Sequence, residues 1–467
     1  MKDNYKLAIH GGKPVRSREF RSRPFITEDM IDKVSCMLKE GRLTRFIGSP
    51  ISGTHEIIEC KSADGEEINS AVSFLGGPSV RMLESRWSKM HKVDYSISVN
   101  SATSGLTTAI MALHISPGDE VICSPFSFTA SATAIILANA IPVFADIDLD
   151  TFCLSPEAAE ASITESTRAI MPVHWNSNAG DLDKLLKIAE KQGLKVIEDA
   201  SQSPGMEYKG KYLGVHGDVG VYSLNEPKNI MTGEGGMIVT DSKDIAVKCR
   251  LIRNHGEAIV DQHSTDDLVV NALGYNFRLV ELLAEIGSEQ LKHLAYLNGV
   301  RKENYDYLAQ RLVSEFGEYI LPQKITHGES YAPYTAGFRW MSEKSKIHRN
   351  LVADILRSEG IPVASGVSRL MSENPLFQRQ LAYGREHCPF SCHLYKRRGR
   401  YFVPPLPNAK RLQEEEYLGF FQIGWPNTVE DMDDIIKGFR KIVANKNCLS
   451  KETDFSNQNI FVSGRGG

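Results

Sequence analysis

Short apolar runs alternate with helical patterns from about residue 80 to residue 245, and this alternation is the main structural signal in the chain. The runs are continuous, which is typical of strands that are covered on both faces. Apolar residues from 182 to 189 recur at helical spacing, and Gly193 marks the predicted end of that helix. The pattern predicts a mostly parallel α/β sheet with helices on both sides. The predicted strands lie at residues 120–123, 142–145, 169–173, 195–198, 219–222 and 237–240.

Beyond residue 280 the pattern changes to long helices. Helical spacing covers residues 279–294 and 300–316, and residues 427–430 resemble a capping box before a last apolar-periodic helix. This part reads as a smaller α+β domain. The predicted units are a large domain at 20–290, a loop inserted into it at 49–79, a small domain at 291–446 and a flexible, polar tail at 447–467.

Composition and charge argue against several function classes. The chain of 467 residues has 54 Lys+Arg against 58 Asp+Glu, and the formal net charge of -4 gives no general field for nucleic acid or an anionic membrane. No run reaches the roughly 20 apolar residues of a membrane span, and the first residues lack the apolar core of a signal peptide. Eight cysteines in this length do not make a disulfide framework. We expect a cytoplasmic protein without a nucleic-acid or membrane partner.

Four soft-metal ligands gather in the stretch His387, Cys388, Cys392 and His393. Zinc sites usually join two well-separated ligand pairs, and the sequence shows no second pair. We therefore expect no metal and interpret the stretch as a pocket-lining loop or as plain structure, with a metal site as the alternative.

The chemistry is carried by one lysine and one aspartate. Lys228 follows the predicted strand at 219–222, and Asp199 ends the strand at 195–198. Pyridoxal phosphate (PLP) requires such a pair, because an amine holds its aldehyde as an imine and a carboxylate keeps its ring nitrogen protonated. Taken singly, the lysine could be a surface residue and the aspartate an N-cap. Because ligands of parallel sheets bind beyond the carboxyl ends of the strands, the two residues are expected to face one site.

A phosphate cradle is predicted where a strand gives way to a helix. The stretch 100–105, which contains Ala102 and Thr103, has small residues at a helix N-terminus, where backbone N–H groups and the helix dipole favour an anion. Plain helix capping is the alternative.

Three further residues complete the set of candidate cofactor contacts. Phe128 follows a strand end and could stack on the pyridine ring, although core packing would also explain it. Gln202 could reach the phenolate oxygen of the cofactor or could lie at a solvated helix start. Ser223 could bind phosphate or cap the loop that holds Lys228.

Together these stretches resemble the DegT/DnrJ/EryC1/StrS family of sugar aminotransferases, over roughly residues 20–443. The matching segments are SVNSATSGL at 98–106, PGDEVI at 117–122, DID at 146–148, PVH at 172–174, EDASQ at 198–202, Lys228 followed by GEGG at 233–236, NHG at 254–256 and GYNFR at 274–278. The resemblance implies PLP fold type I: a large α/β domain with a mostly parallel seven-stranded sheet and a smaller C-terminal α+β domain. It is interrupted at 49–79 and near 380–410, where a second inserted loop is expected.

The resemblance also implies roles for individual residues. Ala102, Thr103 and Ser223 would hold the phosphate, and Phe128 would stack on the ring. Asp199 would pair with the pyridinium, Gln202 would bond the ring oxygen O3′, and Lys228 would form the Schiff base and transfer the proton. Asn276, which composition alone would make a turn residue, would reach the phosphate of a neighbouring subunit. This role implies a homodimer with shared active sites.

The implied activity is a ping-pong transfer of an amino group from glutamate or glutamine to a keto-sugar, which we expect to be nucleotide-linked. A cyclitol or a free keto-sugar acid is the alternative acceptor, because the opening residues 8–16 look like branches acting on such molecules. After His174 the chain reads Trp175-Asn176-Ser177, where the family usually has an aromatic-Gly-Gln sequence, so the acceptor side is the least determined. A sugar dehydratase is a second enzymatic alternative, although such members replace the lysine by histidine. A regulatory protein of the same fold would not need Lys228 and Asp199.

Overall fold

Seven strands form the central sheet, in the order β1-β9-β8-β5-β4-β2-β3. The computed structural model describes residues 5–21, 24–44, 46, 76–256, 273–326 and 330–452. The strands are β1 (Tyr95–Val99), β2 (Glu120–Cys123), β3 (Ile141–Phe144), β4 (Thr167–Met171), β5 (Lys195–Asp199), β8 (Val219–Ser223) and β9 (Gly236–Thr240). Neighbouring strands run parallel from β3 to β8, and β9 is antiparallel to both β8 and β1. The sequence-based prediction of a mostly parallel α/β sheet is therefore confirmed.

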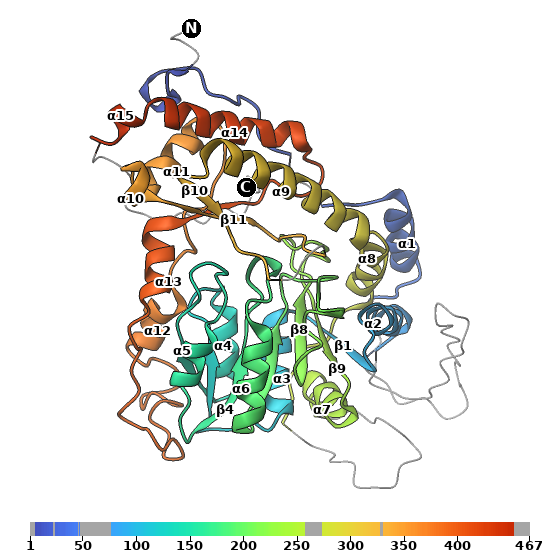
Figure 1. The fold of residues 1–467 in the computed structure, drawn as a ribbon. Helices are drawn as coiled ribbons and strands as arrows, with labels where there is room; N and C mark the ends of the chain where they lie inside the picture. The colour runs from blue at the N-terminus through green and yellow to red at the C-terminus, as the bar shows by residue number, and fades with distance from the viewer. Residues whose placement is uncertain are drawn as a thin grey trace, which may run out of the picture.

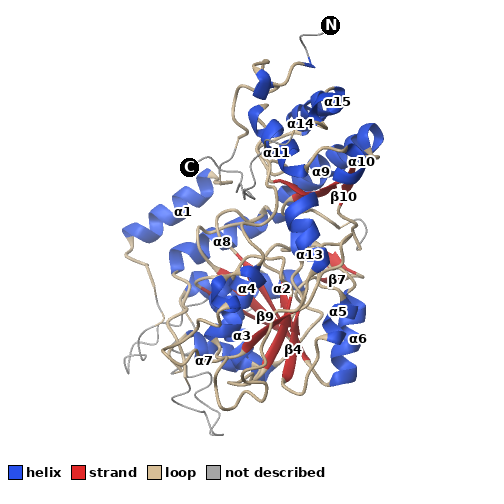
Figure 2. Ribbon diagram, turned by 90° about the vertical axis from the view of Figure 1, so that its left-hand side faces the viewer, coloured by secondary structure: helices blue, strands red, loops and turns tan. Residues whose placement is uncertain are grey.

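Helices cover both faces of this sheet, as Figure 2 shows. One face packs against α3 (Ala102–Ala112), α4 (Ala130–Leu137) and α7 (Lys243–Arg253). The other packs against α5 (Pro156–Ala161), α6 (Leu182–Gln192), α2 (Pro78–His91) and α8 (Glu281–Lys292). Successive strand residues point to opposite faces, so Val196 is buried against α6 while Ile197 is buried on the α3 side. This two-sided burial explains why the strands read as continuous apolar runs.

A second, antiparallel sheet lies beyond the carboxyl ends of the parallel strands (Figure 1). It consists of β10 (Ile320–Pro322), β11 (Ala336–Trp340) and β12 (Tyr417–Phe420). Its core is shared with α9 (Leu294–Phe316), α11 (Arg349–Ser358) and α14 (Val429–Ala444). We call this part, which holds the three-stranded sheet and these helices, the C-terminal lobe. Leu7 and Phe20 lie in the same core, so the front of the chain packs on the lobe rather than on the large sheet.

The remaining elements are short or peripheral. They are α1 (Glu28–Lys39), the hairpin β6 (Glu207–Tyr208) and β7 (Lys211–Tyr212), α10 (Ser342–Ser345), α12 (Pro375–Gln378), α13 (Pro407–Arg411) and α15 (Lys446–Leu449). None of the helices in the described ranges is both long and apolar enough to cross a membrane.

The expected insertion at 380–410 packs on the large sheet. Tyr395 is buried in the core of that sheet and donates to Glu120 Oε1 at 2.7 Å, and Tyr401 donates to the carbonyl oxygen of Pro142 at 3.0 Å. Pro142 belongs to β3, the edge strand, so this segment runs along an edge that would otherwise present unpaired backbone groups. Most of the other expected insertion, 49–79, lies outside the described residues, and α2 begins at Pro78.

Two local predictions need correction. The capping box before α14 uses Thr428 and Asp431, one residue later than the pattern suggested, because Thr428 is the residue with extended backbone at the helix start. The tail expected at 447–467 does not include residues 447–449, because α15 continues to Leu449 and that side chain is buried in the lobe. Residues 453–467 lie outside the described part of the chain.

Candidate active site

A cavity of about 400 Å³ opens where the parallel strands end and the C-terminal lobe begins. Its walls come from α3, the loops after β2, β4, β5 and β8, and segments of the lobe. Seven of the eight cofactor-site residues expected from the sequence line it: Ala102, Thr103, Phe128, Asp199, Gln202, Ser223 and Lys228. The fold thus brings together residues as far apart in the sequence as Ala102 and Lys228.

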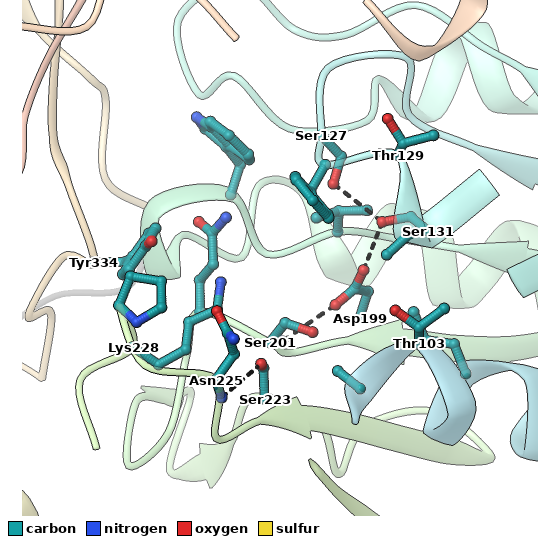
Figure 3. A pocket seen from close by; sticks show the side chains of 18 of the residues that line it. Thr103, Ser127, Thr129, Ser131, Asp199, Ser201, Ser223, Asn225, Lys228 and Tyr334 are labelled. Atoms are coloured by element: carbon teal, nitrogen blue, oxygen red, sulfur yellow. Dashed lines mark hydrogen bonds between the residues drawn. The ribbon is translucent and has the colours of Figure 1, made fainter. Parts of the chain in front are cut away.

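Lys228 projects into this cavity from the loop between β8 and β9. The loop is closed by backbone hydrogen bonds from Leu224 to Gly235 and from Glu226 to Gly233, both at 2.9 Å. The Lys228 ammonium lies 4.4 Å from the centre of the Tyr334 ring (Figure 3). Burial lowers the pKa of Lys228 from 10.5 to about 8, and the Asp199 carboxylate partly opposes that change. With this pKa, roughly a tenth of the amine is neutral, and hence nucleophilic, at pH 7 and about half at pH 8.

Asp199 ends β5 and is 4 % exposed. Ser131, in the first turn of α4, donates to Asp199 Oδ2 at 2.7 Å, and the backbone N–H of Ser201 donates to Oδ1 at 3.2 Å. The Ser127 hydroxyl lies 3.0 Å from that of Ser131 and extends the chain of hydroxyls (Figure 3). Donors to both oxygens fix the orientation of the carboxylate.

The start of α3 forms a cradle of backbone N–H groups. Ser101 is the N-cap, and its side chain accepts from Ser104 N at 3.1 Å. Gly236, which opens β9, lies so close that an added Cβ would be 2.8 Å from Ala102 N. The glycine therefore allows the strand end to reach the helix end. Ser223 pairs with Gly236 across the two strands and lines the same part of the cavity.

Phe128 and Gln202 face the middle of the cavity in different ways. Phe128 is 72 % exposed, which is unusual for phenylalanine and leaves its ring face available for stacking. Gln202 is held firmly, because its Oε1 accepts from Asn176 N at 2.6 Å. That bond leaves the amide NH₂ as the remaining donor of the side chain.

Asn276 lies outside the cavity of its own chain. Its side chain is exposed and its Oδ1 accepts from Arg278 Nε at 2.8 Å. Its carbonyl oxygen accepts from Asn100 Nδ2 at 3.4 Å, so the segment runs beside the start of α3. The role that was expected of Asn276 therefore requires a second chain.

None of the residues from His387 to His393 lines this cavity. In the described ranges, no group of three or more His, Cys, Asp or Glu side chains has an arrangement that could hold a metal ion. Phe390, within the stretch, is buried in the core of the large sheet.

The cavity partners of Asp199 and Lys228, which are Ser131 and Tyr334, were not anticipated from the sequence. Ser131 lies three residues after Phe128, in the first turn of a helix that follows a strand, which is a signal that could have been used. Tyr334 comes from the lobe, more than 100 positions from Lys228, and no local pattern points to it.

The residues present suit PLP. An amine with a lowered pKa, a fixed carboxylate, an anion cradle and an accessible aromatic ring are the groups that its aldehyde, ring nitrogen, phosphate and ring face require. An added Cβ at position 236 would lie 2.8 Å from Ala102 N. Because residue 236 is glycine, no side chain there covers this backbone N–H group of the cradle.

Comparisons with known proteins agree with this geometry. The sequence model of the DegT/DnrJ/EryC1/StrS aminotransferase family matches residues 57–416. The chain is 30% identical over 465 residues to the L-glutamine:2-deoxy-scyllo-inosose aminotransferase of Streptomyces kanamyceticus, covering 95% of this chain and 98% of that protein. It is 34% identical over 348 residues to the UDP-N-acetyl-3-dehydro-alpha-D-glucosamine 3-aminotransferase of Acidithiobacillus ferrooxidans, covering 74% of this chain and 87% of that one.

The fold is also similar to that of a solved aminotransferase from Psychrobacter cryohalolentis. The TM-score is 0.74 at 24% identity, and the match covers 92% of this chain and 100% of that one. The family match, the length over which the relatives align and the lysine–aspartate pair in the cavity lead to one conclusion: the chain belongs to the DegT/DnrJ/EryC1/StrS aminotransferase family, whose members depend on PLP.

Proposed function

We propose that this protein transfers an amino group from glutamine or glutamate to the keto group of a sugar or a sugar-like ring, with PLP as the carrier, in two half-reactions. The observation that carries the proposal is the Lys228 amine, with its pKa lowered to about 8, in one cavity with the buried Asp199 carboxylate. PLP supplies an aldehyde and a ring that accepts electrons.

The residues around the cofactor divide the work. Asp199, fixed by Ser131, would pair with the ring nitrogen and favour its charged form. Ala102 and Thr103 present the start of α3 to the phosphate, and Ser223 adds a hydroxyl. These contacts anchor one end of the cofactor so that its reactive carbon stays within reach of Lys228.

Other residues would contact the ring of the cofactor and its reactive carbon. Phe128 would stack on the ring, and Gln202 would donate to its hydroxyl oxygen. Lys228 would hold the cofactor through its amine and, when that amine is free, would accept and return the proton of the amino donor. The low pKa of Lys228 suits both tasks, because the amine can accept a proton and release it again near neutral pH.

Two acceptor classes are candidates. A nucleotide-linked keto-sugar is the expectation from the sequence, and the name of the Acidithiobacillus relative describes such a substrate. A keto-cyclitol is favoured by a different observation: the relative named for 2-deoxy-scyllo-inosose aligns with this chain along nearly its whole length. The name of the same relative supports glutamine as the donor.

We further propose that the enzyme is a homodimer with shared sites. Asn276 is exposed, lies outside its own cavity and sits beside the start of α3. The exposed Phe128 ring also lies at the open side of the cavity, where a second chain would cover it. In such a dimer, Asn276 of one subunit would reach the phosphate of the other.

The test of function uses glutamine labelled with ¹⁵N at its α-amino group, purified protein loaded with PLP, and keto-cyclitol or nucleotide-linked keto-sugar acceptors. Mass spectrometry should find the label in an aminated ring. Lys228→Ala should lower turnover at least about 1,000-fold, while Lys187→Ala, at an exposed lysine of α6, should behave as wild type. The proposal would be refuted if none of the acceptors tried gained the ¹⁵N label, or if Lys228→Ala kept full activity.

A further inference from the structure

The loop from Trp175 to Asn178 connects β4 to α6, and its backbone is strained. Asn176 has φ 53° and ψ 33°, and Ser177 has φ 70°, so two consecutive residues other than glycine adopt the left-handed conformation. Both are fully buried. Such strain persists only where the surrounding structure imposes it, and it is concentrated at functional sites.

On one side the strained residues hold Gln202. The backbone N–H of Asn176 donates to Gln202 Oε1 at 2.6 Å, and the Ser177 hydroxyl donates to the Gln202 carbonyl oxygen at 2.5 Å. An amide whose oxygen accepts from a fixed N–H has only one of its two flipped orientations available. The left-handed backbone therefore determines which way the Gln202 NH₂ group points.

On the other side the same residues are held by the C-terminal lobe. Asn176 Nδ2 donates to Gln323 Oε1 at 3.1 Å, and Gln323 Nε2 donates to the carbonyl oxygens of Trp175, at 3.2 Å, and Thr151, at 2.6 Å. Gln323 directly follows β10 and is 2 % exposed. Gly337 of β11 leaves the necessary room, since an added Cβ there would lie 2.6 Å from Asn176 Nδ2.

The start of the loop is fixed independently. His174 is fully buried, and its Nε2 lies 2.8 Å from Glu198 Oε2. The Glu198 carboxylate also accepts from the backbone N–H groups of Gly214, His216 and Gly217, at 2.6–2.7 Å. With His174 held by the large sheet, Gln323 holds the Asn176 side chain from the lobe.

We propose that Asn176 is a positioning residue that links Gln323 of the C-terminal lobe to Gln202 in the cofactor cavity. The backbone N–H of Asn176 orients the Gln202 amide, and its side-chain NH₂ group donates to Gln323. The inference rests on the proposed function, in which Gln202 donates to the cofactor. It means that a residue of the lobe that touches no cofactor affects how tightly the cofactor is held.

The experiment is a double-mutant cycle on PLP binding, which needs no turnover. The dissociation constant of PLP is measured for wild type, Gln202→Ala, Gln323→Ala and the double variant, together with the pH dependence of the absorbance band of the bound cofactor. Gln202→Ala should weaken binding about fivefold, the usual effect of one lost hydrogen bond. Gln323→Ala should weaken it by a similar factor in wild type and should have no further effect in the Gln202→Ala background.

Two further variants separate positioning from general damage. Gln290→Ala removes another buried glutamine, whose Nε2 donates to the Phe25 carbonyl oxygen at 2.5 Å; it should lower the melting temperature and leave PLP binding unchanged. Asn176→Gly keeps the backbone N–H and suits the left-handed conformation, so it should fold well. Without the side-chain link, it should reproduce the Gln323→Ala effect on PLP binding.

The outcomes distinguish the two proposals. Equal effects of Gln323→Ala with and without Gln202, or no effect in either, would overturn the positioning role of Asn176. Wild-type PLP binding and an unchanged absorbance titration in Gln202→Ala would instead show that Gln202 is not a cofactor contact, and the inference would fall with that assignment. A cycle with the expected coupling in a protein that transfers no amino group would overturn the proposed function alone.

Discussion

At the residue scale, the environment of Lys228 decides how the chain can react. Burial lowers the pKa of the amine and the Asp199 carboxylate raises it, and burial has the larger effect. The Tyr334 ring, 4.4 Å from the ammonium, stabilises the charged form as well. The pKa of the amine, about 8, therefore lies close to neutral pH. A small change in the surroundings of the amine then alters the fraction of it that is neutral and reactive.

This balance predicts a pH profile. Only the neutral amine attacks an aldehyde, so the rate at which the cofactor-free protein captures PLP should rise with pH and level off above about 8. Asp199→Asn removes a negative charge that favours the ammonium, and the midpoint should move to lower pH. Stopped-flow absorbance at 0.1 M salt would measure both profiles. A midpoint near 10.5 in wild type, or a shift to higher pH in the variant, would contradict the assignment.

At the element scale, the cavity depends on the close approach of β9 to α3. An alanine Cβ at position 236 would lie 2.8 Å from Ala102 N and 2.9 Å from the Ser101 carbonyl oxygen. Both neighbours are backbone atoms of the cradle, which cannot move without shifting the helix. The cradle thus depends on a glycine that contributes no side chain to it.

Gly236→Ala should therefore weaken PLP binding at least tenfold, because it displaces the N–H groups that face the phosphate. Overpacking of this kind should also cost about 1–3 kcal/mol of stability. Gly299→Ala is a matched control: position 299 lies in α9 with open space around it, and the change should stabilise the helix by about 0.5–1 kcal/mol. Equilibrium dialysis and thermal unfolding check both. Normal PLP binding in Gly236→Ala would show that the cradle lies elsewhere.

Much of the element scale was accessible from the sequence, because strands that are buried on both faces, such as 219–222, consist of continuous apolar runs. Asp199 was accessible because it ends a predicted strand, and Lys228 because it lies in the loop after one. The contribution of Tyr334 was not, since it depends on how the lobe docks on the large sheet. The strained turn at Asn176 was also hidden, because asparagine there is compatible with any turn and only the contacts with Gln202 and Gln323 give it a defined position.

At the scale of the whole molecule, the two sheets are joined by more than the chain connections. Residues at the front of the chain complete the core of the lobe, where Glu359 accepts from the backbone N–H groups of Ala8 and Val15. The segment at 380–410 runs the other way, from the lobe onto the edge of the large sheet. The cavity lies where the carboxyl ends of the parallel strands meet the lobe, and Asn276 does not line it.

Shared sites predict rescue between inactive subunits. Lys228→Ala and Asn276→Ala chains, each with low activity alone, should regain up to about a quarter of the wild-type activity when unfolded, mixed and refolded together, because one of the two sites in each mixed dimer then has both residues. Activity of the mixture is compared with that of each variant refolded alone. Complete absence of rescue, with dimers verified by light scattering, would count against a shared site.

If Lys228 and Asp199 use PLP as an amino carrier, an amino donor alone should change the absorbance spectrum of the bound cofactor. Purified protein loaded with PLP is mixed with glutamine, or with glutamate, in the absence of any acceptor. The absorbance of the aldehyde form should fall as that of the amine form rises, with one 2-oxo acid released per site. An unchanged spectrum with both donors, while PLP remains bound to Lys228, would contradict this role of the two residues.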